Sequence, residues 1–275
     1  MLKKAFLILL SLLLAASLFA CNKSDTDGEK VPPPGLGDDL GKTEEEPPAT
    51  LVMGEDIAGT DLKWELYSDH VMYVTCKGTH AATEPCVLPD YAKNGTTPKG
   101  TVLTDQPWWK CGGKNDTDRA EDDGGAYTVQ KLIIGEGITA LGDYAFAFME
   151  LLEEVVLPST LKEISYKSFE DCPKLKTVTG GFGVTVIESE AFLSCLNLTT
   201  VELSPALVEV QDKAFDKVIP AASTRVLTLR IKGTEAAWAA TMTTMRATEN
   251  ADGFPCLGAD NAAFENATIV YFQAS

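Results

Sequence analysis

Two histidines and two cysteines, close together in the sequence, are residue types that bind metal ions. His70, Cys76, His80 and Cys86 follow one another as H-x5-C-x3-H-x5-C, and they include both histidines of the 275-residue chain. Zinc prefers such nitrogen and sulfur ligands, but zinc fingers present them as closely spaced pairs, C-x2–4-C or H-x3–5-H. The series does not match this pattern, so we expect neither a metal nor another cofactor here.

Disulfide formation is the alternative chemistry for the seven cysteines of the chain. Exported proteins more often oxidise their cysteines than bind metal with them. Cys172 and Cys195 occupy an apolar position that recurs along the chain, so we expect them to pack as small buried groups. The sequence leaves the pairing open, because the cysteines can connect in many ways. The better disulfide candidates are Cys76, Cys86, Cys111 and Cys256.

A glycine-rich stretch with a cluster of acids carries the residue types of a calcium site. Its acids are Asp116, Asp118, Glu121, Asp122 and Asp123. Their spacing does not follow D-x-[DN]-x-[DN]-G, the start of a calcium-binding loop. We favour a solvated acidic loop, and whether it binds calcium stays open.

Motifs of dinucleotide-binding proteins and of hydrolases are weak or missing. Gly135 to Ala140 read G-x-G-x-x-A, but the matching place in the next repeat of the chain is a turn at residues 158–163, so we expect no dinucleotide site. The chain contains neither G-x-S-x-G nor H-E-x-x-H. Paired carboxylates that act on glycans stay an alternative, because acids are abundant. We predict a protein that is not an enzyme.

The charge balance disfavours two classes of partner. Lys and Arg total 23 against 40 Asp and Glu, which gives a net charge of −17. Nucleic-acid binding needs clustered basic residues, and adsorption to anionic lipid needs basic segments beside the membrane. We therefore expect no nucleic-acid partner and no electrostatic membrane patch.

Phenylalanine recurs every 23 residues, at Phe146, Phe169, Phe192 and Phe215. A small residue precedes each one, and aliphatic residues stand five and eight positions before it. So many positions in one register predict a leucine-rich-repeat solenoid, in which each unit adds a short strand and a turn or short helix. The predicted fold class is an α/β repeat solenoid with a parallel β-sheet on its concave face.

The strand of each unit is the L-x-x-V-x-L stretch, at residues 152–157, 175–180 and 198–203, with an opening copy at 129–134. In the last unit the chain gains a loop at residues 217–224, so we expect Val226, Leu229 and Ile231 to take the buried positions.

Residues on either side of the central valine should point away from the core, since side chains alternate along a strand. Stacking aligns them in two columns, with Ile133 and Val156 as an apolar patch. We predict ligand binding on these columns, and a neutral face with binding elsewhere or on the cap loops is the alternative. The columns are Lys131, Glu154, Thr177, Thr200 and Thr228, and Ile133, Val156, Thr179, Glu202 and Arg230.

The segments on both sides of the repeats predict caps. Residues 61–78 alternate as a hairpin that turns at Ser68-Asp69. Pro107-Trp108-Trp109 offers two large side chains to cover the open end of the first repeat. After the repeats, Thr234 is expected to cap a helix that buries Trp238, Met242 and Met245, and residues 268–272 predict a final strand.

The repeats carry a family resemblance. The stretches LEEVVLPSTLKEISYKSFEDCPKL and IGEGITALGDYAF resemble the BspA-type leucine-rich repeat of bacterial cell-surface proteins, over residues 129–232. The pattern departs at Gly180-Gly181, where Leu-Pro is expected, and at Val218, which replaces a cysteine. The resemblance implies surface recognition of a protein or glycoprotein, such as one of the host extracellular matrix.

The N-terminus resembles a lipoprotein signal. Lys3 and Lys4 precede an apolar run that is shorter than the roughly 20 residues of a membrane-spanning helix. Residues 18–21, Leu-Phe-Ala-Cys, resemble the lipobox, which implies cleavage before Cys21 and lipidation of that cysteine. An ordinary signal peptide is the alternative. Residues 22–50 are rich in proline and acids, which predicts a disordered tether.

We therefore expect five segments: a signal peptide at 1–20, a lipidated Cys21 with a tether to residue 50, an N-terminal β cap at 51–128, repeats at 129–232 and a C-terminal cap at 233–275. The expected function is that of a monomeric adhesion protein on the bacterial outer membrane or cell surface, with the periplasmic face as the alternative location. A glycan-binding or glycan-processing accessory lipoprotein, or a structural envelope component, is the alternative function.

Overall fold

The computed structural model describes residues 48–77, 85–91, 96–97, 100–101, 106–108 and 128–273, which lie in one compact unit. The predicted signal peptide, Cys21 and most of the tether lie outside these residues. So do His80, Trp109, Cys111 and the acidic loop.

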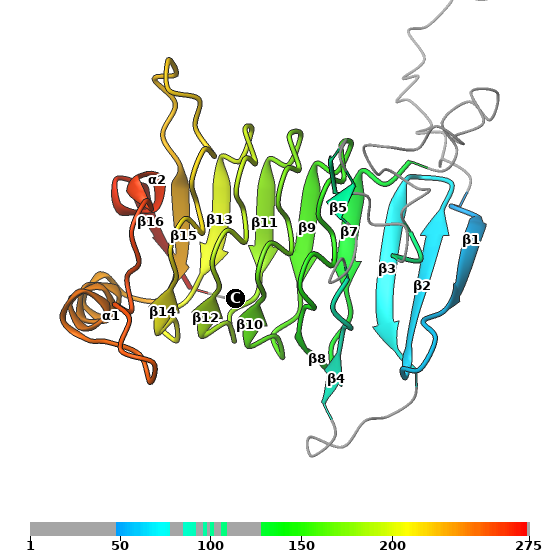
Figure 1. The fold of residues 1–275 in the computed structure, drawn as a ribbon, viewed down its shortest axis with the longest axis horizontal. Helices are drawn as coiled ribbons and strands as arrows, with labels where there is room; N and C mark the ends of the chain where they lie inside the picture. The colour runs from blue at the N-terminus through cyan, green and yellow to red at the C-terminus, as the bar shows by residue number, and fades with distance from the viewer. Residues whose placement is uncertain are drawn as a thin grey trace, which may run out of the picture. The chain divides into compact units, whose positions relative to one another are not determined.

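A parallel sheet of repeat strands confirms the predicted solenoid (Figure 1). Each repeat supplies one strand to it, and the column of strands runs in register from unit to unit. The strands are β7 (Lys131–Ile134), β9 (Glu154–Leu157), β11 (Thr177–Gly180), β13 (Thr200–Leu203) and β15 (Thr228–Lys232).

A second parallel sheet of shorter strands lies on the other side of the units. It has the order β14-β12-β10-β8-β4, so one strand of each repeat joins it. Turns, rather than helices, complete each unit. The strands are β4 (Cys86–Val87), β8 (Ile138–Ala140), β10 (Glu163–Ile164), β12 (Val186–Ile187) and β14 (Glu209–Val210).

The N-terminal cap extends the larger sheet with three strands, β1 (Leu51–Asp56), β2 (Leu62–Tyr67) and β3 (Val71–Cys76). The predicted hairpin is confirmed, since β2 and β3 pair antiparallel. Strand β1 was not predicted. Strand β3 then pairs in parallel with β7, which joins the hairpin to the repeats without a break in the sheet. A separate short pair is formed by β5 (Thr96–Thr97) and β6 (Gly100–Thr101).

The C-terminal cap contains the predicted helix and strand. Helix α1 (Glu235–Ala247) begins at Thr234, whose hydroxyl accepts a hydrogen bond from the N–H of Ala237 at 3.2 Å. Trp238 and Met245 are buried and Met242 is partly buried. A short helix, α2 (Ala262–Glu265), precedes β16 (Thr268–Phe272), which ends the sheet in parallel with β15. None of the helices in the described part of the chain is both long and apolar enough to cross a membrane.

One buried position in the last unit differs from the prediction. Val226 is 48% exposed, whereas Leu227 is fully buried. The strand keeps its register, with Thr228 opposite Thr200. The chain enters β15 from a longer loop than the other repeat strands do (Figure 1), and the exposed Val226 lies just before the strand. Leu227 therefore replaces Val226 in the core.

The recurring phenylalanines form one stacked column through the core. Phe146, Phe169, Phe192 and Phe215 are buried, with ring centroids 5.6, 5.4 and 5.2 Å apart. Trp108 stacks on the first ring at 5.0 Å and Phe264 on the last at 5.3 Å. The prediction that Trp108 covers the open end of the first repeat is confirmed.

Two positions of each turn adopt the left-handed backbone region. They stand two residues before and two after the recurring phenylalanine, and their φ angles lie between +53° and +63°. This conformation is costly for residues other than glycine. Lateral hydrogen bonds hold it in place, for example from the N–H of Tyr144 to the carbonyl of Tyr166 at 3.0 Å. The positions are Tyr144, Phe148, Lys167, Asp171, Glu190, Ser194, Lys213 and Lys217.

The departure at Gly180-Gly181 has a steric reason. Both residues have positive φ, +77° and +63°. A Cβ atom on Gly180 would lie 2.2 Å from the carbonyl oxygen of Leu157, in the strand before it. Only glycine fits this turn, so the Leu-Pro sequence of the repeat pattern could not adopt it.

Candidate binding surface

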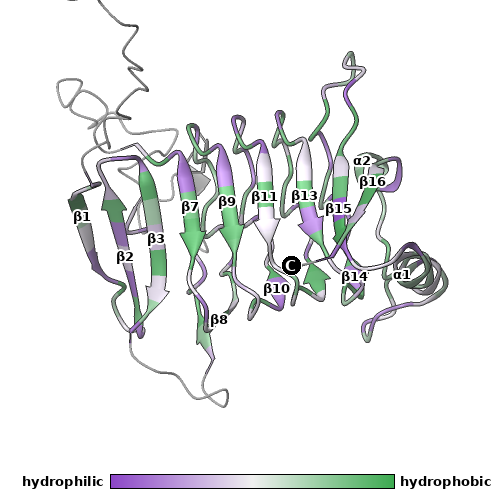
Figure 2. Cartoon of the chain, turned by 180° about the vertical axis from the view of Figure 1, so that it is seen from behind, coloured by the Kyte–Doolittle hydropathy of each residue, from purple (hydrophilic) through white to green (hydrophobic). Residues whose placement is uncertain are grey.

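The outward side of the nine-stranded sheet, which we call the strand face, carries the two predicted columns. Register pairs Lys131 with Glu154, Glu154 with Thr177, and so on to Thr228. Ile133 pairs with Val156, and Val156 with Thr179. Figure 2 shows that β7 and β9 are hydrophilic where they begin and hydrophobic beyond, whereas β11 is pale over most of its length. The alignment agrees with the prediction, while ligand binding by these residues stays a prediction.

An apolar row lies on the N-terminal half of the strand face. Tyr73 on β3 is opposite Ile133 on β7, which is opposite Val156 on β9. All three side chains are partly exposed. Tyr67 adds a second ring, 5.5 Å from that of Tyr73 in an edge-to-face contact. We call these four residues the aromatic patch.

A shallow depression of about 410 Å³ adjoins the aromatic patch on the N-terminal cap. The Lys63 ammonium lies 3.0 Å from the Glu65 carboxylate on its floor. Both tyrosines of the patch line it, together with Ala49, Lys63, Glu65, Asp69 and Thr75. Sequence reasoning missed this part of the surface, because it treated the hairpin only as a cap. The outward alternation of Tyr67 and Tyr73 was the available signal.

The middle of the strand face carries short polar side chains. Lys131 and Glu154 form an ion pair at 3.1 Å, which borders the aromatic patch. Thr177, Thr200 and Thr228 follow in the same column, and all are partly exposed. The hydroxyl of Thr179 lies 3.4 Å from the carbonyl of Val155. Hydroxyl groups of this kind offer both donors and acceptors to a ligand.

The C-terminal part of the strand face uses its charges internally. Glu202 is only 8% exposed; it accepts the N–H of Gly180 at 2.9 Å and pairs with Arg230. The Arg230 guanidinium also lies over the ring of Phe272, 4.8 Å from its centre. Lys232 lies over Phe182 at 4.4 Å. These charges hold β11, β13, β15 and β16 together, which leaves them less available to a ligand than the patch residues.

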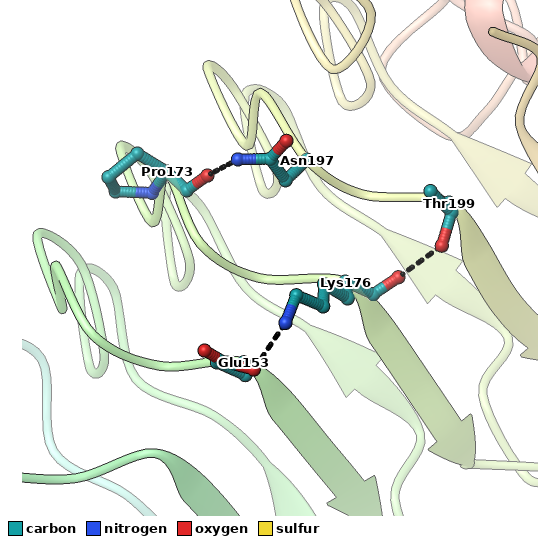
Figure 3. A network of polar contacts seen from close by, with 5 residues as sticks. All are labelled: Glu153, Pro173, Lys176, Asn197 and Thr199. Atoms are coloured by element: carbon teal, nitrogen blue, oxygen red, sulfur yellow. Dashed lines mark hydrogen bonds and ion pairs between the residues drawn. The ribbon is translucent and has the colours of Figure 1, made fainter.

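A ridge of polar contacts borders the beginning of the repeat strands (Figure 3). Lys176 pairs with Glu153 of the preceding unit, and its carbonyl accepts the Thr199 hydroxyl of the next at 3.0 Å. The Asn197 amide donates to the carbonyl of Pro173 at 2.7 Å. Each contact joins neighbouring units, so the ridge stabilises the stack.

A partly buried lysine lies among the turns that follow the shorter strands of the solenoid. The Lys167 ammonium lies 3.1 Å from Glu170 and 3.1 Å from Glu190, and over the rings of Tyr144 and Tyr166. Burial alone would lower the pKa of Lys167, but the hydrogen bonds and charges of the glutamates outweigh it and raise the pKa. Burial has the opposite effect on Tyr144 and raises the pKa of its hydroxyl to about 12, against the opposing charge of Lys167. Both groups stay protonated at neutral pH, so this cluster is a structural joint between units.

The cysteines near the N-terminal cap form a disulfide. Cys76 and Cys86 are bonded, which ties β3 to β4 and leaves neither thiol free for a metal. The Nδ1 atom of His70 lies 2.9 Å from the hydroxyl of Thr128 instead. Among the described residues there is no group of three or more His, Cys, Asp or Glu side chains arranged to hold a metal ion.

The remaining described cysteines are buried thiols. Cys172 and Cys195 pack in the core as predicted, with their sulfurs 3.2 and 3.0 Å from the carbonyls of Phe146 and Phe169. Cys256 was one of the four disulfide candidates, but its thiol is free. Its backbone joins β14 to the C-terminal cap, and the side chain is packed in the core there.

The first half of the G-x-G-x-x-A stretch is the turn between β7 and β8, as predicted from the repeat register, and its second half is β8 itself. Glu136 accepts hydrogen bonds from the N–H groups of Ser159 and Thr160 in the next unit, at 2.9 and 3.2 Å. Desolvation by itself would raise the pKa of Glu136, but the hydrogen bonds from Ser159 and Thr160 together outweigh it and lower the pKa. The carboxylate occupies a turn between units and serves their stacking.

One comparison with known proteins supports the repeat assignment. The family model for the BspA type leucine rich repeat region matches residues 125–227, with 6 copies. No curated protein matches the chain. A leucine-rich repeat protein from Eubacterium ventriosum is 18% identical over 66% of this chain and 44% of that one, with a TM-score of 0.43. One from Bacteroides ovatus is 20% identical over 54% and 39%, with a TM-score of 0.35.

A leucine rich cell surface protein from Faecalibacterium prausnitzii is 17% identical over 81% of this chain and 55% of its own, with a TM-score of 0.31. The chain thus spans less than half the length of the first two solved structures. The period, the stacked strands and the family model agree on one assignment. Residues 125–227 of this chain therefore form a leucine-rich repeat region of the BspA type.

Proposed function

We propose that this chain is a non-enzymatic binding protein of the bacterial cell surface, which recognises a protein or glycoprotein through the N-terminal half of its strand face. The aromatic patch is the observation that carries the proposal. It places two tyrosines, Ile133 and Val156 side by side on a rigid sheet, where no other element of the described residues pairs with their outward side chains.

The composition of this surface fits the anatomy of protein interfaces. Aromatic side chains supply large contact areas at low entropic cost, and they are enriched at the centres of binding sites. The two ion pairs, Lys131 with Glu154 and Lys63 with Glu65, lie beside the patch. Charged groups around an apolar centre exclude water and set orientation more than they add affinity.

Placement at the surface rests on the N-terminal sequence. A lipid on Cys21 would anchor the protein firmly, since its three acyl chains exceed the single chain that binds membranes only marginally. The tether of residues 22–50 would hold the domain away from the bilayer, at a distance of about 30 Å for a flexible chain. This arrangement presents the strand face to partners outside the cell.

The strand face can be tested with a matched set of variants. Ile133→Glu with Val156→Glu places charges in the aromatic patch. Val208→Glu makes the same kind of change at a valine that is 55% exposed before β14, away from the strand face. Each purified protein is passed over immobilised extracellular-matrix glycoproteins, and its melting temperature is measured to establish that it is folded.

We expect at least one glycoprotein to bind the wild type and Val208→Glu, with affinity for the double variant reduced about tenfold or more. Equal binding by the folded double variant would refute the assignment to the strand face. Turnover of a glycan polymer by the wild type would refute the non-enzymatic role.

A further inference from the structure

The C-terminal cap forms a second pocket, on the outer side of the smaller sheet and distinct from the strand face. Residues 249–255 fold back on themselves after α1, with a bridge between Glu249 and Pro255. The pocket between this turn and β14 measures about 330 Å³, which is within the range of ligand sites. Its lining is Ser189, Glu209, Gln211, Asp212, Asn250, Asp252, Phe254 and Pro255.

The side chain of Phe254 is 66% exposed at this pocket, more than any other large apolar side chain among the described residues. The backbone that carries it is well fixed, because its N–H donates to Asn250 Oδ1 at 3.0 Å and its carbonyl accepts the Asn250 N–H at 2.7 Å. A rigid turn thus presents an aromatic ring to solvent. An aromatic face attracts cations and planar groups.

A buried carboxylate lies deeper in the pocket. Glu209 is only 9% exposed, and its Oε1 atom accepts hydrogen bonds from the amides of Asn250 at 2.7 Å and Gln211 at 3.0 Å. These two bonds fix its orientation. Its second oxygen, Oε2, has no partner within the described part of the chain.

The unused polar atoms of the pocket are mainly acceptors. The Asp252 carboxylate has no partner among the residues that the structure describes, and Asp212 uses one oxygen to accept the Ala259 N–H at 2.7 Å. The Ser189 hydroxyl is bonded to Gln211 Oε1 at 3.2 Å. No basic side chain is among the described residues that line the pocket. A ligand here must therefore bring donors and positive charge.

We propose that this pocket binds an arginine side chain of a peptide or protein partner. A guanidinium has five N–H donors and no acceptor, and its plane stacks on aromatic rings. It would lie against Phe254 and donate to the free oxygens of Glu209 and Asp252. A neutral sugar fits less well, since its hydroxyl and ring oxygens would face carboxylate oxygens as well as donors.

The experiment uses the ¹⁵N-labelled protein and short peptides observed by NMR. The probes are acetyl-Gly-Arg-Gly-amide, the same peptide with citrulline, which removes the charge, and the neutral sugar maltotriose. We expect the arginine peptide to shift the amide signals of Phe254, Asp252 and Gln211. The citrulline peptide should bind at least tenfold more weakly.

Three variants and one control locate the binding. Glu209→Gln should weaken arginine binding about tenfold, and Asp252→Asn and Phe254→Ala about threefold each. Glu55→Gln, at an exposed carboxylate on β1, should leave it unchanged. If Glu209→Gln unfolds, the two exposed variants decide the question.

Equal binding of the arginine and citrulline peptides would overturn the proposal. So would arginine binding that is the same in wild type, Asp252→Asn and Phe254→Ala, or that falls equally in Glu55→Gln. Shifts at these amides with maltotriose but not with the arginine peptide would identify a sugar pocket instead. These outcomes do not depend on the strand face, so the two proposals fail or stand separately.

Discussion

The interior repeats and the two caps solve the same problem by different means. Inside the solenoid, backbone groups join each unit to the next. The N–H of Phe146 donates to the carbonyl of Ser168 at 2.8 Å, and Phe169 and Phe192 make the equivalent bonds at 2.9 and 2.8 Å. A regular chain of such bonds has an unpaired carbonyl at one end and an unpaired N–H at the other, and both are costly when buried.

The N-terminal cap satisfies the first of these ends with side chains. Ala145 is the counterpart of Ser168, and its carbonyl would receive the N–H of an earlier repeat. It accepts the Trp108 indole N–H at 3.0 Å and the Gln106 amide at 2.9 Å instead. The Trp108 ring then takes the place of the next phenylalanine in the column.

The C-terminal cap satisfies the other end. The N–H of Phe215 would donate to a further repeat, and it donates to the Oδ1 atom of Asn261 at 3.0 Å. Phe264, three residues later, supplies the last ring of the column. In the caps, single side chains therefore make the hydrogen bonds that backbone groups of the neighbouring repeat make in the interior. Loss of one side chain in a cap should therefore destabilise that cap alone, whereas loss of one in the interior should destabilise the whole stack.

Removal of an interior ring should have the largest effect. Phe169→Ala would leave a cavity between two rings, those of Phe146 and Phe192, and should lower the free energy of unfolding by about 3–5 kcal/mol. Urea denaturation measures this loss. Phe254→Ala removes the same side chain from an exposed site and should cost less than about 0.5 kcal/mol. Similar losses in the two variants would contradict the stacked column.

Removal of the Asn261 side chain tests whether the C-terminal cap depends on this one residue. This side chain is fully buried; besides accepting from Phe215, it donates to the carbonyls of Gln211 at 2.8 Å and Gly258 at 3.0 Å. Asn261→Ala would leave the Phe215 N–H and the Gly258 carbonyl without partners, whereas the Gln211 carbonyl would keep the Ala214 N–H at 3.3 Å. The variant should cost about 2–4 kcal/mol.

The location of the change would sharpen the comparison. Hydrogen exchange should quicken in β14, β16 and the cap helices of Asn261→Ala, while β7 and β9 keep their protection. Asn266→Ala, at an exposed asparagine at the end of α2, is the matched control and should cost about 0.5 kcal/mol. Uniform loss of protection along all repeats would show that the cap and interior unfold as one unit.

The N-terminal cap also has a covalent link that the repeats lack. The disulfide between Cys76 and Cys86 closes a short loop, with a sequence separation of 10 residues. Loops of this size contribute about 2–3 kcal/mol by restricting the unfolded chain. Reduction with dithiothreitol should lower stability by about that amount, and Cys76→Ser with Cys86→Ser should match it. If the double variant is as stable as the oxidised wild type, the cap does not need the link.

The same contrast explains how much the sequence could predict. The 23-residue period specified the phenylalanine column, the repeat strands and the alignment of Lys131 with Glu154, because each position is repeated four or five times. Gln106 and Asn261 occur once, with no period to mark them. Their roles depend on which backbone groups remain unpaired after the units have stacked.

The candidate surface was predicted in part for a related reason. Ile133 and Val156 follow from the period, but Tyr73 joins them only through the parallel pairing of β3 with β7, across more than fifty residues of sequence. Alternation within a hairpin shows which of its side chains point outward, but it does not show which strand will pair beside the hairpin. Val226 was misplaced because the loop before β15 changes how the chain enters a strand whose register is otherwise kept.

The smallest expected change in stability concerns the charge of Glu188, which lies in the turn after β12. Burial, and then the nearby carboxylates of Glu163 and Asp143, raise the pKa of Glu188, whereas the hydrogen bond from the Tyr166 N–H opposes the rise. The folded state therefore binds this proton more tightly than the unfolded chain does. Ionisation at pH 7 lowers stability, and this loss disappears as the pH falls through the raised pKa towards the ordinary value of 4.5.

Glu188→Gln removes the charge and keeps an oxygen for the Tyr166 N–H, which lies 2.7 Å from the carboxylate. We expect the melting temperature to rise by about 1–2 °C at pH 7 and to match that of the wild type at about pH 4, because both side chains are then neutral. Glu55→Gln controls for the loss of one negative charge from an acidic protein. An equal gain in the control, or a gain that persists at pH 4, would mean that the stacked turns do not disfavour the partly buried charge of Glu188.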